Sequence, residues 1–227
     1  QMLAYERAYD SSRITSAEID YIECHATGTP LGDKVELDSM EMFFAAPETA
    51  EGSKTKPLIG SVKSNLGHML TAAGMGGMTK VILALQNGII PATVGVEDVM
   101  TSKNDGVSAD QIVRQALDWP HKRQQRSAAV SAFGFGGTNA HIVFEAANTE
   151  KICGKAKQPK KTVRKKQSST AIIGMEAIFG GCNGLHEFYQ TIYDNKQHFR
   201  KLPPERWKGL EQHPELSQVT EGAWLES

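Results

Sequence analysis

The stretch IDYIECHATGTPLGD (residues 19–33) holds the clearest indication of how this chain folds. Its first six residues are rich in β-branched and aromatic side chains, as is typical of a buried strand. His25 follows directly and opens a loop of small and hydroxyl-bearing residues, in which a ligand can approach the backbone closely. The sequence therefore predicts a strand that delivers a histidine to a loop at its end.

A helix is predicted immediately after this loop, over residues 33–46. Asp33 is a suitable N-cap and Glu36 stands three residues later, which together resemble a capping box. Apolar residues then recur at helical spacing and predict a buried stripe made of Leu37, Met40 and Phe44.

Strands and helices continue to alternate further along the chain. Residues 57–65 form a second predicted strand, which ends near Lys63, and residues 71–86 form a helix that Asn87-Gly88 closes. One face of that helix is predicted to be buried through Met75, Met78, Ile82 and Leu85. The alternation predicts an α/β fold.

Two more strands, over residues 127–133 and 139–145, are joined by the glycine-rich segment GFGGT and predict a hairpin. Glycines at the tip leave backbone N–H groups free to face a ligand, and Phe135 between them is suited to act as a movable gate. A tight turn that requires positive φ angles explains Gly136 and Gly137 equally well.

A second histidine, His68 in GSVKSNLGHM (residues 60–69), also stands next to glycine near the predicted end of a strand. Two imidazoles that converge on one pocket can act as neutral donors to a developing oxyanion, or as a base and an acid. The alternative is that they are packing residues. We expect His141, in the middle of a strand, to be a hydrogen-bonded interior residue, and we expect surface or packing roles for the other four histidines, His121, His186, His198 and His213.

The composition excludes several classes of protein. The 227 residues are 40% hydrophobic and 22% charged, as in an ordinary globular protein. No run of about 18 apolar residues predicts a membrane span, and the first residues lack the pattern of a signal peptide. A net charge of −1 predicts no attraction to nucleic acid. Three scattered cysteines without metal-ligand spacing predict no metal site and a reducing, cytoplasmic setting.

Residues 148–169 are predicted to link two structural units. They include the run KICGKAKQPKKTVRKK (residues 151–166), which holds eight Lys or Arg and no acidic residue. Such a run is typical of a solvated linker, and the alternative is a segment that grips phosphate or an acidic partner. Beyond it, residues 170–181 predict a strand and its turn, and residues 184–195 an amphipathic helix.

Three segments taken together resemble a known family. ECHATGTPLGD, GSVKSNLGHMLTAAGMGG and SAFGFGGTNAHIVFE are similar, in order and spacing, to the C-terminal half of the β-ketoacyl synthases of fatty acid and polyketide synthesis. The resemblance spans about residues 1–147. It implies a thiolase-like fold with αβαβα layers, present here only in part.

The resemblance also implies an activity and a set of site residues. Members of the family carry out a decarboxylative Claisen condensation between malonyl and acyl thioesters. His25 and His68 match the two histidines that donate hydrogen bonds to the malonyl thioester oxygen, and Lys63 matches the lysine that orders the second histidine. Thr27 and Thr29 match threonines that hold the phosphopantetheine arm of an acyl carrier protein. The gate and its oxyanion-hole backbone would be Phe135 and Gly136. No cofactor bound directly to the chain is implied.

The family nucleophile is a cysteine in a motif of the type Asp-Thr-Ala-Cys-Ser-Ser, and no such motif occurs here. Cys24 precedes His25 on a strand, so its side chain should point away from the histidine and be buried. Cys153 lies in the predicted linker and Cys182 in a predicted loop. We therefore expect the chain alone to be inactive.

Residues 170–227 resemble the beginning of a second ketosynthase-like domain. The match AIFGGC, in place of the usual Arg-Phe-Pro, together with QHF and ERWKGL, is similar to the chain-length-factor domain of bacterial polyunsaturated fatty acid synthases. Such a domain pairs with an active ketosynthase as a pseudo-dimer. Two alternatives stay open: tandem ketosynthases of a modular polyketide synthase, and a non-catalytic pairing scaffold.

Overall fold

The computed structural model describes residues 1–12, 14–44, 56–120, 125–147, 172–201, 203 and 221–225. Its centre is a four-stranded sheet in the order β2-β1-β5-β6. β1 pairs in parallel with both β2 and β5, and β5 pairs antiparallel with β6. The strands span Tyr21–Glu23 (β1), Leu58–Gly60 (β2), Ser127–Phe133 (β5) and Asn139–Glu145 (β6).

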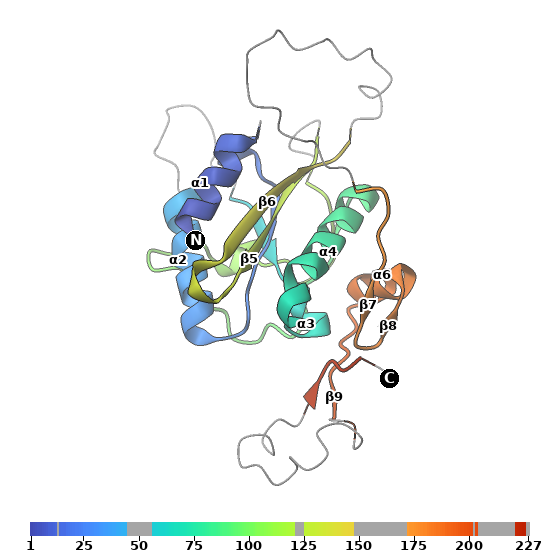
Figure 1. The fold of residues 1–227 in the computed structure, drawn as a ribbon. Coiled ribbons are helices and arrows are strands. Elements are labelled where there is room, and N and C mark those ends of the chain that lie inside the picture. The colour runs from blue at the N-terminus through green and yellow to red at the C-terminus, as the bar shows by residue number, and fades with distance from the viewer. Residues whose placement is uncertain are drawn as a thin grey trace, which may run out of the picture.

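Helices cover both faces of this sheet (Figure 1). α1 (Met2–Ser11) and α2 (Pro30–Phe44) lie on one face, and α4 (Ala73–Asn87) lies on the other. The described residues thus form three layers, helix–sheet–helix. The described part also includes three short antiparallel pairs and several short 3-10 helices: β3 (Ile89–Ile90) with β4 (Leu117–Asp118), β7 (Ile178–Phe179) with β8 (Cys182–Asn183), β9 (Arg200–Lys201) with β10 (Glu221–Gly222), η1 (Ser16–Glu18), η2 (Leu70–Ala72) and η3 (Ala109–Gln111).

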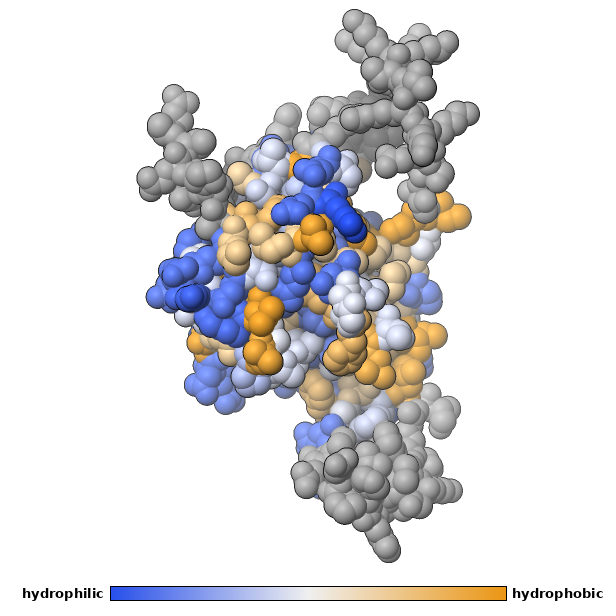
Figure 2. Space-filling view, turned by 60° about the vertical axis from the view of Figure 1, so that its left-hand side comes forward, coloured by the Kyte–Doolittle hydropathy of each residue, from blue (hydrophilic) through white to orange (hydrophobic). Residues whose placement is uncertain are grey.

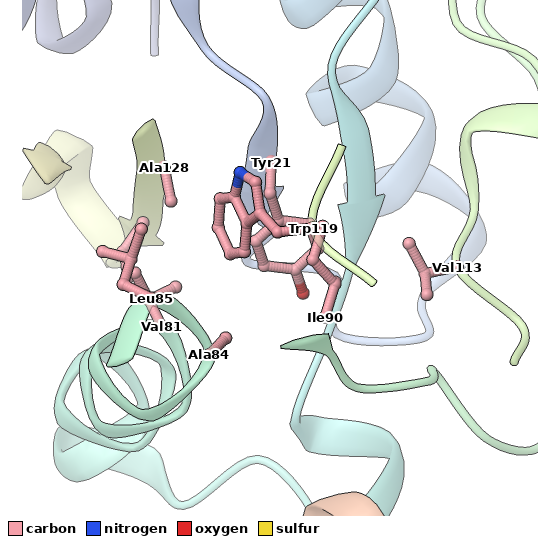
Figure 3. Packing of buried hydrophobic residues seen from close by; sticks show 9 residues of the cluster. Tyr21, Val81, Ala84, Leu85, Ile90, Val113, Trp119 and Ala128 are labelled. Atoms are coloured by element: carbon pink, nitrogen blue, oxygen red, sulfur yellow. The ribbon is translucent and has the colours of Figure 1, made fainter. Parts of the chain in front are cut away.

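Alternation along β1 divides the core into two clusters. Ile22 and Cys24 pack with residues of α1 and α2, whereas Tyr21 packs with α4, Trp119 and β5. Figure 3 shows this second cluster, with Trp119 beside Tyr21 and with Val81, Ala84 and Leu85 reaching it from α4. Because each face of β1 meets a different helical layer, the strand is buried on both sides.

The first predicted helix forms, but it begins three residues earlier than expected. α2 starts at Pro30, since proline suits the first helical position and lacks only an N–H that would have no helical partner. Asp33 is therefore not the N-cap. Its carboxylate accepts hydrogen bonds from the backbone N–H groups of Thr27 and Gly28 in the preceding loop.

The prediction of a strand up to Lys63 is wrong at its end. β2 stops at Gly60, and Lys63 is the first residue of a one-turn helix, α3 (Lys63–Leu66). Val62 has already entered the helical region, with φ −69° and ψ −16°. Lys63 thus reaches the site from a helix and not from an extended strand.

α4 ends as expected, at Asn87, with Gly88 in the left-handed region at φ 70°. The predicted buried face is confirmed at Leu85, which is buried, and at Met78, which packs against the core, but it is wrong at Met75, which is 58% exposed. Gly76, Gly77 and Lys80 are buried as well. The helix rests on the sheet through its glycines: a Cβ added at Gly77 would lie 3.0 Å from Cγ of Glu23. Close approach of small residues, and not a methionine stripe, sets this interface.

The predicted hairpin is confirmed, with the two strands at the expected residues. The tip contains the turn η4 (Phe135–Gly137), in which Gly136 and Gly137 have φ angles of 71° and 84°. His141 is buried on β6, with Tyr9 Oη 3.2 Å from Nε2 and Ser131 Oγ 3.0 Å from Nδ1. The expectation that it is an interior, hydrogen-bonded residue is confirmed.

Beyond the predicted linker, which lies outside the described residues, the chain packs on α3 and α4. The predicted helix forms as α6 (Leu185–Tyr193), whereas the predicted strand at residues 170–181 is reduced to β7 in the part described. Phe188 and Ile192 of α6 join a cluster with Val62, Leu66 and Leu83. We call residues 177–199 the second segment.

Two features of the described surface bear on the molecule's surroundings. No helix in the described ranges has the length and apolarity needed to cross a membrane. The face that Figure 2 brings forward mixes hydrophilic with hydrophobic residues. Large apolar side chains that stay exposed include Leu31 and Met42 of α2.

Candidate active site

The loop after β1 is held by carboxylates from α2. Glu36 accepts hydrogen bonds at 2.8 Å from the backbone N–H groups of both His25 and Ala26, one on each carboxylate oxygen. Asp33 holds the next two N–H groups, at 3.0 and 3.3 Å. Burial raises the pKa of Glu36 to about 7. His25 is thereby fixed at the end of the strand, as the sequence predicted.

His68 reaches the same end of the sheet from α3. Gly67 ends that helix with φ 73°, and Met69 and Leu70 also have positive φ angles, 59° and 46°. Such angles turn the backbone sharply between α3 and η2. The turn brings His68 beside His25, and the imidazole of His68 is exposed.

The two imidazoles lie together. Their ring centroids are 5.4 Å apart and the planes are nearly perpendicular, at 85°. Nδ1 of His25 is buried and has no hydrogen-bond partner among the described residues. Burial lowers the pKa of His25 to about 4, and the positive charge of Lys63 acts in the same direction. The imidazole of His25 is therefore neutral at pH 7.

Lys63 is the third residue of this group. It is 8% exposed, and burial lowers the pKa of its ammonium group while the carboxylates of Glu23 and Glu36 oppose that shift. The carboxylate of Glu23 also forms an ion pair that the sequence did not predict.

Glu23 and Lys80 form a fully buried ion pair, with Oε2 2.9 Å from Nζ. Glu23 also accepts hydrogen bonds from Tyr21 Oη at 2.7 Å and from the backbone N–H of Val62 at 2.5 Å. One side chain thus ties β1 to α4 and to the residue before Lys63. Strand alternation offered the signal: Glu23 faces the layer opposite Cys24, and a buried carboxylate requires a partner.

Thr27 and Thr29 lie in the loop that carries His25, and their hydroxyl oxygens are 3.0 Å apart. Thr27 and Lys63 also line a cavity of about 490 Å³, together with Asp33, Glu36 and Ser64. The two imidazoles are not among the lining residues of this cavity. The cavity therefore adjoins the histidine pair without enclosing it.

The hairpin tip supplies an unexpected aromatic neighbour. Phe133, at the end of β5, has its ring centroid 5.8 Å from that of His25. Phe135, the predicted gate, is fully exposed, and Gly136 beside it adopts φ 71°. Phe133, which the sequence analysis did not single out, thus lies against the imidazole of His25.

The two described cysteines, Cys24 and Cys182, are buried thiols and are not suited to act as nucleophiles. Cys24 is 5% exposed, its thiol lies 3.9 Å from the sulfur of Met40, and burial raises its pKa. The expectation of a buried structural thiol is confirmed. Cys182 is likewise buried, and it lies on β8 and not in a loop as predicted. Cys153 lies outside the described residues. Among those described, no three His, Cys, Asp or Glu side chains gather into a possible metal site.

Comparison with known proteins places this geometry in a family. The family model described as "Beta-ketoacyl synthase, C-terminal domain" matches residues 1–97, and "Ketoacyl-synthetase C-terminal extension" matches residues 110–198. A polyunsaturated fatty acid synthase protein of Thraustochytrium sp. is 39% identical over 208 residues, which are 89% of this chain and 10% of that protein. A phenolphthiocerol/phthiocerol polyketide synthase protein of Mycobacterium tuberculosis is 42% identical over 65% of this chain and 6% of its own length.

Solved structures agree with these relatives. The structure described as PfaC Keto synthase-Chain length factor has a TM-score of 0.62 and 43% identity, and the match covers 99% of this chain and 23% of that one. Ketosynthase twelve of the bacillaene polyketide synthase of Bacillus amyloliquefaciens gives a TM-score of 0.53 at 32% identity over 65% of this chain and 27% of that one. The chain thus spans about a tenth or less of the two curated relatives and under a third of these structures.

The chain belongs to the β-ketoacyl synthase family, and its fold is the thiolase-like ketosynthase fold, present in part. Within the family it resembles polyunsaturated fatty acid synthases and the ketosynthase–chain length factor structure along almost its whole length, whereas the two polyketide synthase matches cover 65% of it.

Proposed function

We propose that this chain supplies the two-histidine half of a β-ketoacyl synthase that lengthens acyl chains in polyunsaturated fatty acid biosynthesis. The observation that carries the proposal is the pair of imidazoles 5.4 Å apart at the end of the central sheet. Two rings at this separation are suited to donate to one carbonyl oxygen placed between them, and burial keeps His25 uncharged at neutral pH. Neutral N–H groups aimed at one oxygen are suited to stabilise a developing negative charge.

In the proposed reaction, His25 and His68 each donate a ring N–H to the thioester oxygen of a malonyl unit. The bond between the carboxylate carbon and the α-carbon breaks, carbon dioxide leaves, and the electron pair enters the enolate. The enolate carbon then attacks the carbonyl of an acyl group held on a cysteine thioester. A new carbon–carbon bond forms as the thiolate leaves.

The remaining roles follow from the same proposal. Lys63 begins α3, and its positive charge helps to keep the imidazole of His25 uncharged. Thr27 and Thr29 contact the phosphopantetheine arm of an acyl carrier protein, and their adjacent hydroxyls at the edge of the loop support this role. Phe135 gates the site. Its backbone N–H, beside Gly136, donates a hydrogen bond to the carbonyl oxygen of the acyl-cysteine.

We propose that the acylated cysteine comes from another part of the synthase. Cys24 and Cys182 are buried thiols with raised pKa values, which makes both poor nucleophiles. The chain alone is then inactive. Residues 148–169 link the ketosynthase part to the start of a chain-length-factor domain at residues 170–227, and the two domains form a pseudo-dimer in the cytoplasm.

The test is His68→Ala in the complete synthase, with malonyl decarboxylation on the acyl carrier protein as the measured rate. Loss of one oxyanion donor costs about 100- to 1,000-fold in rate, and we expect a loss of this size. His186→Ala, at an exposed position of α6, is the matched control and should leave the rate unchanged. Full activity of His68→Ala would contradict the proposed role.

A modular polyketide synthase is the second candidate, because the mycobacterial polyketide synthase protein is 42% identical over 147 residues. In a synthase of that kind the second domain would itself carry a reactive cysteine, and a thiol-reactive substrate analogue would label both domains. A ketosynthase with a chain length factor should label at one cysteine, and a pure scaffold at none.

A further inference from the structure

α3 is too short to keep its own shape. One turn of helix contributes little stability in isolation, so tertiary contacts must hold it. Lys63 begins it, and His68 follows two residues after its end. Any element that packs on the back of α3 therefore helps to decide where the imidazole of His68 lies.

The second segment makes three hydrogen bonds to this short helix. Asn65 Nδ2 donates to the carbonyl of Lys196 at 2.8 Å, and the N–H of His198 donates to the carbonyl of Asn65 at 2.9 Å. Gln197 Nε2 donates to the carbonyl of Ser64 at 3.0 Å. Asn65 is completely buried, so its amide has no water to replace a lost partner.

Apolar contacts continue the same interface. Val62 and Leu66, on either side of Asn65, lie in one cluster with Phe188 and Ile192 of α6. Gly67, directly before His68, faces the ring of Phe199, which a Cβ at that position would meet at 3.5 Å. Apolar contacts and hydrogen bonds to the second segment thus hold the backbone of residues 62–67 in place.

We propose that the second segment is a structural part of the histidine site, and that Asn65 is the positioning residue through which it holds His68 in place. This inference rests on the proposed function. The residues that lie beyond the linker then do more than begin another domain, because without them the turn that carries His68 lacks its support. A displacement of about 1 Å can cost on the order of 100-fold in rate.

The test is Asn65→Ala in the complete synthase, with two rates measured separately: acylation of the nucleophilic cysteine and decarboxylation of malonyl carrier protein. We expect decarboxylation to fall at least 10-fold with its KM unchanged, and cysteine acylation to stay within 2-fold. Gln197→Ala removes only an exposed side chain, cannot unfold the protein, and should lower decarboxylation by a smaller factor.

Gln111→Ala is the matched control. It removes an amide-to-carbonyl hydrogen bond of similar length, 2.9 Å from Gln111 Nε2 to the carbonyl of Pro57, that does not touch the second segment. We expect decarboxylation at the wild-type rate in this variant. An equal loss in Gln111→Ala and Asn65→Ala would show a general stability effect and would overturn the inference.

Asn65→Asp adds a pH readout that a purely structural role would not move. A protonated carboxyl group can donate to the carbonyl of Lys196, whereas a carboxylate cannot. The decarboxylation rate of this variant relative to wild type should therefore rise as pH falls from 8 to 5.5. A wild-type rate in both Asn65→Ala and Gln197→Ala would refute the inference alone, whereas a wild-type synthase that fails to decarboxylate malonyl thioesters would refute the proposed function.

Discussion

At His25, burial and neighbouring charge act in the same direction. The ring is partly enclosed, Lys63 is close, and the pKa falls to about 4. An unfolded histidine has a pKa near 6.5. Between these two values the folded chain binds fewer protons than the unfolded chain, so acid favours unfolding.

The free energy of unfolding should therefore decline as pH falls from about 6.5 to about 4 and be flat, for this residue, above pH 6.5. His141, whose pKa burial also lowers to about 4, adds to the decline. In His25→Asn, which has no group to protonate at this position, the decline should be smaller. Urea denaturation followed by tryptophan fluorescence measures it.

His186→Asn serves as the control for this pH series, because its ring is exposed on α6. Its unfolding free energy should follow the wild-type curve. If His25→Asn followed that curve as well, the imidazole would not be held neutral by its surroundings, and the proposed donor role would lose its electrostatic basis.

At the scale of elements, α4 illustrates how glycines fix a helix on a sheet. A Cβ at Gly77 would lie 3.0 Å from Cγ of Glu23 and 3.2 Å from Cγ1 of Val130. Glu23 cannot retreat, because Lys80 and two hydrogen bonds hold its carboxylate. A Cβ at Gly76 would instead meet the sulfur of Met69 at 2.7 Å, and that side chain has a free end that can move.

Neighbouring substitutions on α4 should therefore behave differently. Gly77→Ala should lose about 1–3 kcal/mol of unfolding free energy, as overpacked cores do. Gly76→Ala should be unchanged or gain up to about 1 kcal/mol, because alanine is the better helix former. Equal effects in urea denaturation would contradict the rigid contact between Gly77 and Glu23.

At the scale of the whole molecule, the second segment is docked on α3 and α4 by a few large side chains. Phe188 is completely buried in the interface. Phe188→Ala should cost about 3–5 kcal/mol of the docking free energy. Limited proteolysis should then cut residues 172–201 faster, while the central sheet stays resistant.

The control for this experiment is Ile173→Ala, at a side chain that is 99% exposed. Cleavage of this variant should match wild type. Unchanged protection in Phe188→Ala would mean that the segment is held by contacts other than the cluster around α6.

Much of the fold and part of the candidate site could be predicted from the sequence, because they depend on local pattern. The two strands of the hairpin follow from their alternation and glycine tip, and His25 follows from its place just after a strand. His68 was singled out on the same ground, but α3 lies between β2 and His68. The start of α2 was missed because Pro30 outweighs the Asp33 signal. The Glu23–Lys80 pair and the contact of Asn65 with Lys196 join residues 57 and 131 positions apart, which no local pattern reveals.

One arrangement near His25 determines which chemical groups a ligand meets there. Four consecutive peptide N–H groups, at residues 25–28, are already engaged by two carboxylates one helical turn apart on α2. α2 thereby fixes the backbone conformation of the loop, and none of these four N–H groups is available to bind a ligand. A ligand at this loop must therefore be recognised by imidazole and hydroxyl side chains. Single substitutions can change these side chains, while Asp33 and Glu36 keep the backbone of the loop in place.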